Sequence, residues 1–298
     1  MACLSTGLCS RIRRRRVAAL SHKLPKEHRW NDIAKATSEF SVVIGYGGFS
    51  TVYLAGNSAV KAYTGSEYLY LTFKKELDLL LSVVHPNIVN LRGYCDDKEQ
   101  QQGALVLDYF PRGTLADNRT GLPLNKRLAI AFQLSLALNY LHERCIVHGD
   151  VKASNLLLDD DFNCKLCDFG SATRGLSSSA GTSRQLTKFI ITSPGYTDPH
   201  YLKTGVPVVQ NDIYSYGVVL LELLTGKEAF SSDTNLPLTC GIEHLQDVLE
   251  PGLECMLSLA RRCLHFSPNS RPSANQISEA IKGFMPSVLM ASHPLQLP

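Results

Sequence analysis

The 298-residue sequence predicts an α+β protein with two lobes, a small antiparallel sheet followed by a larger helical part. Two observations lead to this prediction. Between residues 40 and 110, short runs rich in β-branched and aromatic residues predominate, with one amphipathic stretch among them. From residue 125 onward, apolar residues instead recur at helical spacing. Strands gathered in one half of a chain and helices in the other are typical of the α+β class.

Strands and one helix are expected in the first half of the chain. FSVVIG, STVYLA and SAVKAY each have the composition of a short strand. Gly56-Asn57 between the last two predicts a two-residue hairpin turn. TFKKELDLLLSVV then places Phe73, Leu77 and Leu80 on one face of a helix, and LVLDYF after it predicts another strand.

Three long segments predict the helices of the second half. They are RLAIAFQLSLALNYLH, NDIYSYGVVLLELLTG and GLECMLSLARRCLHF. The stretch over residues 171–187 is too polar and glycine-rich for a regular element. A long loop inside a compact domain is usually functional, so this segment is a candidate for regulation.

Charge is distributed unevenly along the chain. The formal net charge is +3, but residues 1–29 hold eight Lys or Arg and one Glu, a net +7 that leaves −4 for the remaining residues. A hydrophobic fraction of 44% suffices for a buried core and excludes intrinsic disorder. Because the main body is acidic and has no nucleic-acid-binding motif, we expect no nucleic acid as partner.

The nine cysteines are too sparse and too irregularly spaced for a secreted disulfide framework, which favours a reducing compartment. Cys164 and Cys167 form a CxxC, but no second pair follows at zinc-ribbon spacing. Their strand-like surroundings favour core cysteines over metal ligands. Since no apolar run approaches membrane-spanning length, we expect a soluble protein or one held to a membrane from outside.

A candidate nucleotide-binding motif lies in the first predicted hairpin. In GYGGFSTV, Gly45 and Gly47 lack a Cβ and allow phosphate oxygens to approach the backbone, although an ordinary hairpin can share this pattern. Val52 on the return strand could cover an adenine ring. Lys61 in the next strand faces this loop and needs a carboxylate partner, which Glu76 on the amphipathic helix can supply.

The strongest chemical signal is VHGDVKASNLLLD, followed by CDFG. Phosphoryl transfer needs a carboxylate that orients the attacking hydroxyl, cations over the phosphates and oxygen ligands for Mg²⁺. Asp150, Lys152, Asn155 and Asp168 meet these needs. Each has a structural alternative, such as a turn cap for Asp150 or a turn start for Asp168. Their order and spacing together favour catalysis.

The series of motifs closely resembles the eukaryotic protein kinase family, and within it the plant receptor-like kinases and their cytoplasmic relatives. It includes GYGGFSTVY, AVK, HPNIVNLRGYC, LVLDYFPRGTL, HGDVKASN, DFG, SPGYTDPHYLKTG, NDIYSYGVVLLELLTGKEAF and RPSANQI. The resemblance covers residues 38–284 and implies a bilobal kinase fold, with an N-lobe over 38–107 and a C-lobe over 112–284. Residues 1–37 would then form a disordered basic leader and residues 285–298 a short tail.

The resemblance implies a catalytic role for four residues. Lys61, paired with Glu76, would contact the α- and β-phosphates of ATP. Asp150 would orient the substrate hydroxyl and Lys152 would contact the γ-phosphate. A lysine two residues after the catalytic aspartate is typical of serine/threonine kinases, so the implied activity is transfer of the ATP γ-phosphate to protein hydroxyls. The alternative function is a kinase-shaped scaffold that binds nucleotide with little transfer.

The resemblance also implies which residues bind ATP and a metal ion. The metal ligands would be Asn155 and Asp168, for Mg²⁺ or in its place Mn²⁺. Asp212 would tie the catalytic loop to the central helix of the C-lobe. Besides Lys61, the residues implied to contact ATP are Gly45, Gly47, Gly48, Val52, Ala59, Leu107, Asp108, Phe110 and Leu157.

Three positions depart from the family pattern. Ser50 replaces the third glycine of the phosphate loop, which we expect to be harmless. Gly149 stands where many kinases have an arginine before the catalytic aspartate, which indicates the type without that regulatory arginine, called non-RD. His200 replaces a glutamate that pairs with an arginine matched by Arg271, so we expect a weakened C-lobe with the chemistry intact.

The leader and the partners follow from charge and resemblance. The arginines over residues 11–16 could bind anionic lipid at the cytoplasmic face of the plasma membrane, with Cys3 and Cys9 as acylation sites. An organellar transit peptide or a nuclear signal fits the same composition. A short helix is expected near Trp30 to Ala36. The resemblance implies a protein substrate and a receptor kinase or other signalling protein as partner, and control by association with that partner or by its positioning of Glu76.

Overall fold

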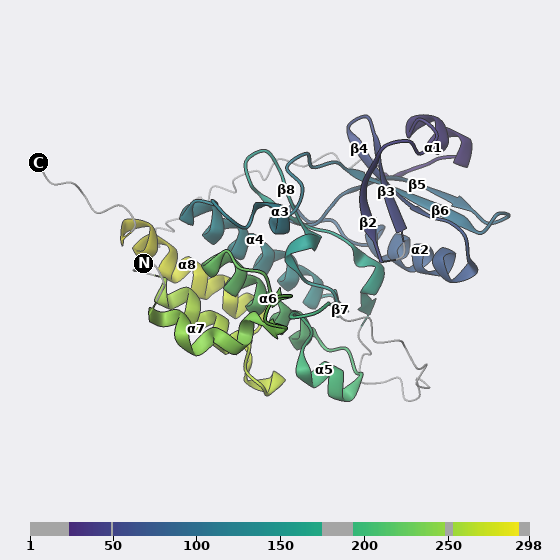
Figure 1. Cartoon of the computed structure of the whole chain (residues 1–298). Coiled ribbons are helices and arrows are strands. Elements are labelled where there is room, and N and C mark those ends of the chain that lie inside the picture. Colours follow the sequence, from purple (N-terminus) through teal and green to yellow (C-terminus); the bar gives the residue numbers. More distant parts are fainter. Residues whose placement is uncertain (1–23, 49, 175–192, 248–252, 292–298) are drawn as a thin grey trace, which may run out of the picture.

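The computed structural model describes residues 24–48, 50–174, 193–247 and 253–291, and it contains the two lobes that the sequence predicts (Figure 1). The N-lobe is a six-stranded sheet with the order β1-β5-β6-β4-β3-β2. Neighbouring strands are antiparallel except for β1 and β5, which are parallel. The strands are β1 (Lys26–Glu27), β2 (Val43–Gly47), β3 (Ser50–Ala55), β4 (Ser58–Tyr63), β5 (Leu91–Asp97) and β6 (Gln102–Asp108). The α+β class is therefore confirmed.

Helix α2 (Glu67–Leu80) packs on this sheet. It begins at Ser66, whose side chain accepts a hydrogen bond from the Leu69 amide at 3.3 Å. Phe73 is fully buried toward β6, where a Cβ on Gly103 would lie 2.3 Å from the Phe73 ring. The glycine thus lets the helix approach the sheet closely. The predicted hairpin turn at residues 56–57 is confirmed between β3 and β4.

The N-lobe begins before residue 38, which corrects the expectation of a disordered leader over residues 1–37. Strand β1 pairs with β5, and α1 (Trp30–Ala36) lies where the sequence predicts a short helix. Ile33 of α1 is buried in a small core with residues of β4, β5 and β6, and the Trp30 and Phe40 rings lie 5.4 Å apart. Residues 1–23, with both candidate acylation cysteines, lie outside the described part of the chain.

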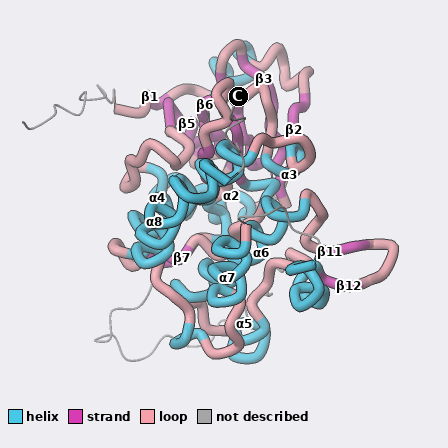
Figure 2. Tube along the Cα trace, turned by 90° about the vertical axis from the view of Figure 1, so that its left-hand side faces the viewer, coloured by secondary structure: helices cyan, strands magenta, loops and turns pink. Residues whose placement is uncertain are grey.

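The C-lobe is mainly helical, and Figure 2 shows its helices gathered away from the N-lobe strands. The three predicted long helices are confirmed as α4, α6 and α7. Helix α6 is buried along most of its length, and its Tyr216 hydroxyl donates to the Ala131 carbonyl of α4 at 2.9 Å. The helices are α3 (Leu115–Asn118), α4 (Leu124–His142), α5 (Pro199–Thr204), α6 (Val209–Thr225), α7 (Glu254–Cys263) and α8 (Ala274–Ala291).

Short strands and 3-10 turns connect the helices of the C-lobe. The strands are β7 (Ile146–Val147), β8 (Leu156–Leu158), β9 (Cys164–Leu166), β10 (Thr173–Arg174), β11 (Phe230–Ser231) and β12 (Leu236–Pro237). The 3-10 segments are Ala153–Asn155, Phe169–Ser171, Leu238–Asp247 and Pro268–Ser270. Helix α8 continues to Ala291 with Val288 in the core, so the expected tail from residue 285 is in part helical. Cys164 is buried in the core, where the CxxC interpretation placed it.

The buried Arg271 has a carboxylate partner, and this corrects the expectation drawn from His200. Both Arg271 and Asp198 have side chains with no exposed surface, and Arg271 Nη2 lies 2.9 Å from Asp198 Oδ1. Asn211 adds a third contact by donating to Asp198 Oδ2 at 2.7 Å. The partner is therefore the aspartate two residues before His200, and the C-lobe anchor is complete.

We expect the His200→Glu variant to melt at the same temperature as the wild type or lower. Arg271 is already paired, and a new carboxylate beside Asp198 would add repulsion without gaining a cation. Thermal unfolding by circular dichroism measures this, with His244→Glu at an exposed position as control. A melting temperature raised by several degrees in His200→Glu alone would contradict the account.

Candidate active site

Sheet register aligns the residues implied to surround an adenine ring. Val52 lies opposite Lys61 across the β3–β4 pair, and Ala59 lies opposite Leu107 across the β4–β6 pair. Because side chains alternate along a strand, Ala59 and Lys61 share one face of β4. Leu157 of β8 bridges to Thr114 from the C-lobe side. The two lobes thus present apolar side chains on either side of the segment that connects them.

Asp108 and Phe110 belong to the segment that connects the two lobes. Asp108 ends β6 and forms an ion pair with Arg92 of the neighbouring β5, which anchors this end of the sheet. Phe110 is half-buried and packs against the main core. Both positions lie at the junction of the lobes, where the resemblance implies adenine binding.

The phosphate loop is closed by a tight contact in the β2–β3 hairpin. A Cβ on Gly47 would lie only 2.6 Å from Ser50 Oγ and 3.9 Å from Lys61 Cε, so a side chain there would displace the Ser50 hydroxyl. Gly48 is exposed in the turn, and Gly45 faces Val52. Ser50 Oγ is buried and has no hydrogen-bond partner among the residues that the structure describes. An orphaned donor beside Lys61 fits a site for phosphate oxygens.

Lys61, Glu76 and Asp168 form a buried cluster between the lobes. The Lys61 ammonium lies 2.8 Å from Glu76 Oε2, 3.0 Å from Glu76 Oε1 and 2.7 Å from Asp168 Oδ1. Burial alone would lower the pKa of Lys61, but the two carboxylates raise it well above its usual value. Burial likewise opposes ionisation of Asp168, and Lys61 outweighs it and lowers the Asp168 pKa. Both shifts favour the charged forms of Lys61 and Asp168.

The Glu76 side chain points into the interior of the protein and is held there by contacts within this chain. Its side chain is 1% exposed and its Oε1 also accepts a hydrogen bond from the Phe169 amide at 3.2 Å. Away from the cluster, Lys74 and Tyr70 of α2 bind the Asp96 carboxylate on β5 at 2.7 and 2.6 Å. Contacts within the chain therefore hold this helix with Glu76 facing inward.

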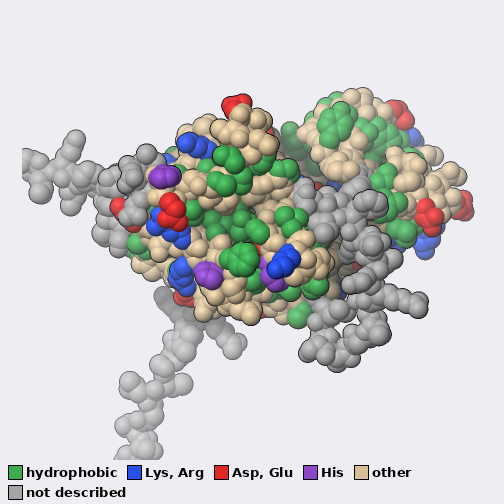
Figure 3. Space-filling model, turned by 60° about the horizontal axis from the view of Figure 1, so that its bottom comes forward, with side chains coloured by type: hydrophobic (Ala, Val, Ile, Leu, Met, Phe, Trp, Pro, Cys, Tyr) green, Lys and Arg blue, Asp and Glu red, His purple; other side chains and the backbone are tan. Residues whose placement is uncertain are grey.

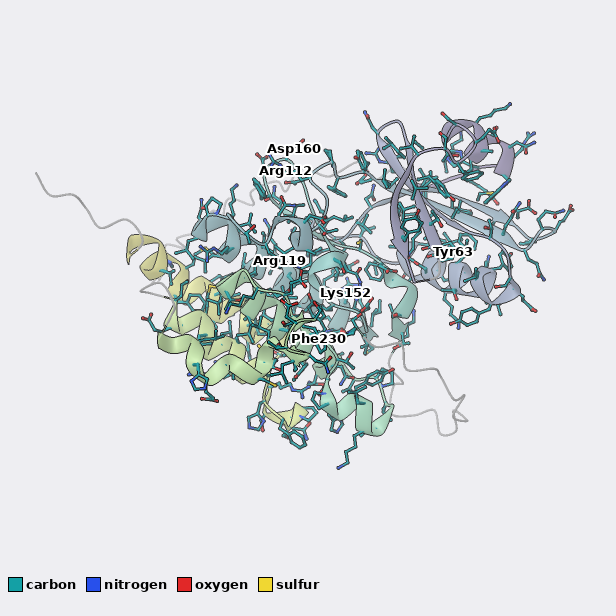
Figure 4. The ribbon with its side chains drawn as sticks, viewed as in Figure 1. Tyr63, Arg112, Arg119, Lys152, Asp160 and Phe230 are labelled. Carbon is teal, nitrogen blue, oxygen red and sulfur yellow. The ribbon has the colours of Figure 1, made fainter. Side chains whose placement is uncertain are left out.

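The catalytic-loop residues meet on the C-lobe side, where Figure 4 labels Lys152. The Lys152 ammonium lies 2.8 Å from Asp150 Oδ2 and donates to Ser193 Oγ at 3.0 Å. Ser193 in turn donates to Asp150 Oδ1 at 2.7 Å. Sequence reasoning missed Ser193, although it begins the quoted motif SPGYTDPHYLKTG. Its hydroxyl bridges the cation and the carboxylate that would act on the substrate.

Asp212 fixes the backbone of this loop from inside α6. Its Oδ2 accepts from the His148 amide at 2.9 Å and its Oδ1 from the Gly149 amide at 2.8 Å, as the resemblance implies. Burial raises its pKa, but His142, whose Nε2 lies 2.9 Å from Oδ2, together with His148 and the Gly149 amide outweighs burial and lowers the pKa. Gly149 has φ of +78°, and a Cβ there would lie 3.0 Å from the Ser171 carbonyl oxygen. The loop conformation therefore favours glycine at this position.

Asn155 and Asp168 supply oxygen ligands suited to a hard cation. The Asn155 amide nitrogen donates to the Asp150 carbonyl at 2.8 Å and to its carboxylate at 3.0 Å, which leaves the amide oxygen available. The Cys167 amide donates to the Asn155 carbonyl at 3.0 Å, so the two ligands are held next to each other. Asp168 has φ of +62°, a left-handed conformation that aims its side chain at Lys61. Mg²⁺ typically uses few protein oxygens together with substrate phosphates, and these residues fit that pattern.

A second residue missed by sequence reasoning is Tyr196. Its hydroxyl donates to Glu222 Oε2 on α6 at 2.6 Å and accepts from the Ala153 amide at 3.3 Å. Burial raises the pKa of Glu222 to about 7. Because partners on α6 and in the catalytic loop both bind Tyr196, the segment from Ser193 onward is anchored beside Asp150.

The fold and the site together define a phosphoryl-transfer enzyme of the kinase type, and comparison with known proteins agrees. The family model for the protein kinase domain matches residues 38–281. A probable receptor-like protein kinase of Arabidopsis thaliana is 41% identical, over 87% of this chain and 88% of the relative. Salt tolerance receptor-like cytoplasmic kinase 1 of Oryza sativa subsp. japonica is 43% identical, over 85% and 79%. The chain belongs to the protein kinase family and, within it, to the plant receptor-like kinases.

Longer relatives also match. A probable LRR receptor-like serine/threonine-protein kinase of Arabidopsis thaliana is 32% identical, over 85% of this chain and 32% of the relative. In the described part of this chain, no helix has the length and apolar character needed to cross a membrane.

Proposed function

We propose that the chain is an active protein kinase that transfers the γ-phosphate of ATP to serine and threonine hydroxyls of protein substrates. The observation that supports this most is the contact network of Asp150, Lys152 and Ser193. It holds a carboxylate ready to accept a hydrogen bond from an incoming hydroxyl, with a cation 2.8 Å away. A lysine in this place is the feature that the resemblance connects with serine/threonine substrates.

We assign the roles of the remaining residues as follows. MgATP, when bound, supplies the transferable phosphoryl group and an ion that offsets its charge. Lys61, held by Glu76, would bind phosphate oxygens, and Asn155 and Asp168 would hold the ion. The residues at the lobe junction would bind adenine, and the Ser50 hydroxyl would gain a partner among the phosphate oxygens. Asp150 would orient the substrate hydroxyl and accept its proton.

The alternative is a kinase-shaped scaffold, and the geometry favours catalysis over it. A scaffold has no need to maintain a buried lysine between a buried carboxylate, Glu76, and a partly buried one, Asp168, because unneeded buried charges reduce stability. Here both the Lys61 cluster and the Asp150 cluster are complete and are linked by the Asn155–Asp150 and Cys167–Asn155 hydrogen bonds. Transfer of labelled phosphate to matched serine, threonine and tyrosine peptides tests the proposal. We expect the serine and threonine peptides to be labelled.

We propose that phosphorylation of the polar stretch over residues 171–187 controls activity only weakly, as expected for a kinase of the non-RD type. Gly149 offers no cation to a phosphate, and Arg174 already donates to Ser82 Oγ at 2.7 Å. We expect alanine at six hydroxyl positions together to lower transfer to an exogenous peptide by less than about tenfold. The positions, all outside the described residues, are Ser177, Ser178, Ser179, Thr182, Ser183 and Thr187. A larger loss would show that phosphorylation of this segment controls the enzyme.

The leader is proposed to hold the kinase at an anionic membrane surface near a receptor kinase. The arginines lie before β1, whereas basic and acidic side chains are interspersed over the described part of the face in Figure 3. Because residues 1–29 carry a net +7 and the remaining residues −4, the positive charge that would attract anionic lipid lies in the leader. Fractionation of a Cys3→Ala, Cys9→Ala protein tests the acylation part, which predicts loss from the membrane fraction.

A further inference from the structure

Tyr63 is an aromatic residue at a buried strand position, where such a residue ordinarily does no more than pack in the hydrophobic core. It is the last residue of β4, two positions after Lys61 and so on the same face, and it is 1% exposed. Figure 4 shows it in the N-lobe beside α2. Its ring contacts Phe73 at 5.8 Å between centroids, and Phe73 precedes Glu76 by nearly one helical turn. Tyr63 therefore faces both the catalytic lysine and the helix that carries its partner.

The hydroxyl of Tyr63 donates a hydrogen bond to Glu76 Oε2. Each Glu76 oxygen consequently accepts two hydrogen bonds. Oε1 accepts from Lys61 and from the Phe169 amide, and Oε2 accepts from Lys61 and from Tyr63. Burial and the neighbouring Glu76 raise the pKa of Tyr63 well above its usual value, so the hydroxyl keeps its proton and remains a donor.

Charge balance makes this donor important. Lys61 is one cation shared between two carboxylates, so the buried cluster has an excess negative charge. A neutral hydroxyl aimed at Glu76 stabilises that charge where water is excluded. Without it, Oε2 would depend on Lys61 alone, and Lys61 is also drawn to Asp168. Glu76 could then rotate away from Lys61. The Lys61 ammonium would no longer be held in the orientation that binds phosphate oxygens.

We propose that Tyr63 is a positioning residue for this kinase, whose hydroxyl fixes Glu76 in the orientation that aims Lys61 at the nucleotide. The proposal rests on the proposed catalytic function and adds a residue that the motif series does not contain. Tyr63 acts through Glu76 and does not touch the reacting groups. The hydroxyl and the ring have separable roles, because the ring packs on Phe73 and only the hydroxyl reaches the carboxylate.

A double-mutant cycle tests this inference. Wild type, Tyr63→Phe, Glu76→Gln and the double variant are compared for kcat/KM with MgATP, at temperatures well below each melting point. We expect Tyr63→Phe to lower kcat/KM by about tenfold in the wild-type background and by less than about twofold in the Glu76→Gln background. Tyr216→Phe, which removes a buried hydroxyl that donates to the Ala131 carbonyl, is the matched control and should keep kcat/KM within about twofold.

The outcomes separate positioning from general stability. Equal losses in both backgrounds, full activity of Tyr63→Phe, or an equal loss in Tyr216→Phe would overturn the inference. Failure of the Tyr63→Phe protein to fold would also overturn the inference, because the hydroxyl would then be needed for folding. Melting temperatures of the same four proteins give a second cycle that does not depend on turnover, and they should also be non-additive. An inactive wild type would contradict the proposed function, while this second cycle would still test the contact.

Discussion

Replacement of Lys61 by methionine, or of Asp168 by asparagine, is expected to reduce phosphoryl transfer by at least about a hundredfold. Positioning and charge stabilisation provide most of the rate in this reaction class, and each change removes one charge from the buried cluster. The Lys61 ammonium is 2.8 Å from Glu76 and 2.7 Å from Asp168, so Lys61→Met leaves two carboxylates without their shared cation. Asp168→Asn removes the charge of a proposed metal ligand. Initial rates with a peptide substrate at saturating MgATP give the result.

Lys126→Met is a suitable control for these variants. Lys126 is also a hydrogen-bonded lysine, but its ammonium donates to the Asp161 carbonyl at 2.7 Å on the exterior of the C-lobe. Its rate should stay within about twofold of the wild type, as expected for a surface substitution. If Lys61→Met and Lys126→Met showed equal rates, the buried cluster would have no part in catalysis.

Removal of the Asp198 carboxylate is expected to cause the largest loss of stability. In Asp198→Ala, Arg271 would remain buried without its anion, and breaking such a pair typically costs about 3–5 kcal/mol. The pKa of Asp198 is lowered, since Arg271 and its hydrogen-bond donors outweigh burial. The pair therefore stabilises the fold above the ordinary aspartate pKa and loses this contribution as the pH falls through the lowered value.

Urea unfolding at neutral pH measures the effect of Asp198→Ala. Glu279→Ala is the matched control, because Glu279 pairs with Lys282 at 2.7 Å on the surface and is expected to contribute about 1 kcal/mol or less. A midpoint for Asp198→Ala close to that of Glu279→Ala would show that Arg271 finds another anion.

The sequence was sufficient for strands β2, β3, β4 and β6, for helices α2, α4, α6 and α7, and for the Lys61–Glu76 contact, because these depend on local periodicity and on motifs a few residues long. It did not predict β1, β5 or α8. The partner of Arg271 was not predictable in the same way. Asp198 and His200 are two residues apart, and which one faces Arg271 depends on how α5 begins. Asp198 caps this helix by accepting from the His200 amide at 2.9 Å, and this turns its carboxylate inward. The motif alone does not contain that geometry.

Tyr63, Ser193 and the start of the N-lobe were missed for related reasons. Tyr63 is indistinguishable from any strand aromatic until α2 is placed over it. Ser193 meets Asp150 across 43 positions of sequence. Helix α1 has a single buried residue, Ile33, so its hydrophobic pattern is too short to indicate that it belongs to the folded lobe.

The most direct test of the central claim compares purified wild type with Asp150→Asn, using labelled ATP, Mg²⁺ and matched serine, threonine and tyrosine peptides. Asp150 is the carboxylate to which Ser193 donates at 2.7 Å and the one proposed to orient the substrate hydroxyl. The account predicts labelling of serine and threonine peptides by the wild type, a loss of at least about a hundredfold in Asp150→Asn, and similar nucleotide binding by both. A wild type that binds nucleotide but labels no peptide above the Asp150→Asn level would contradict it.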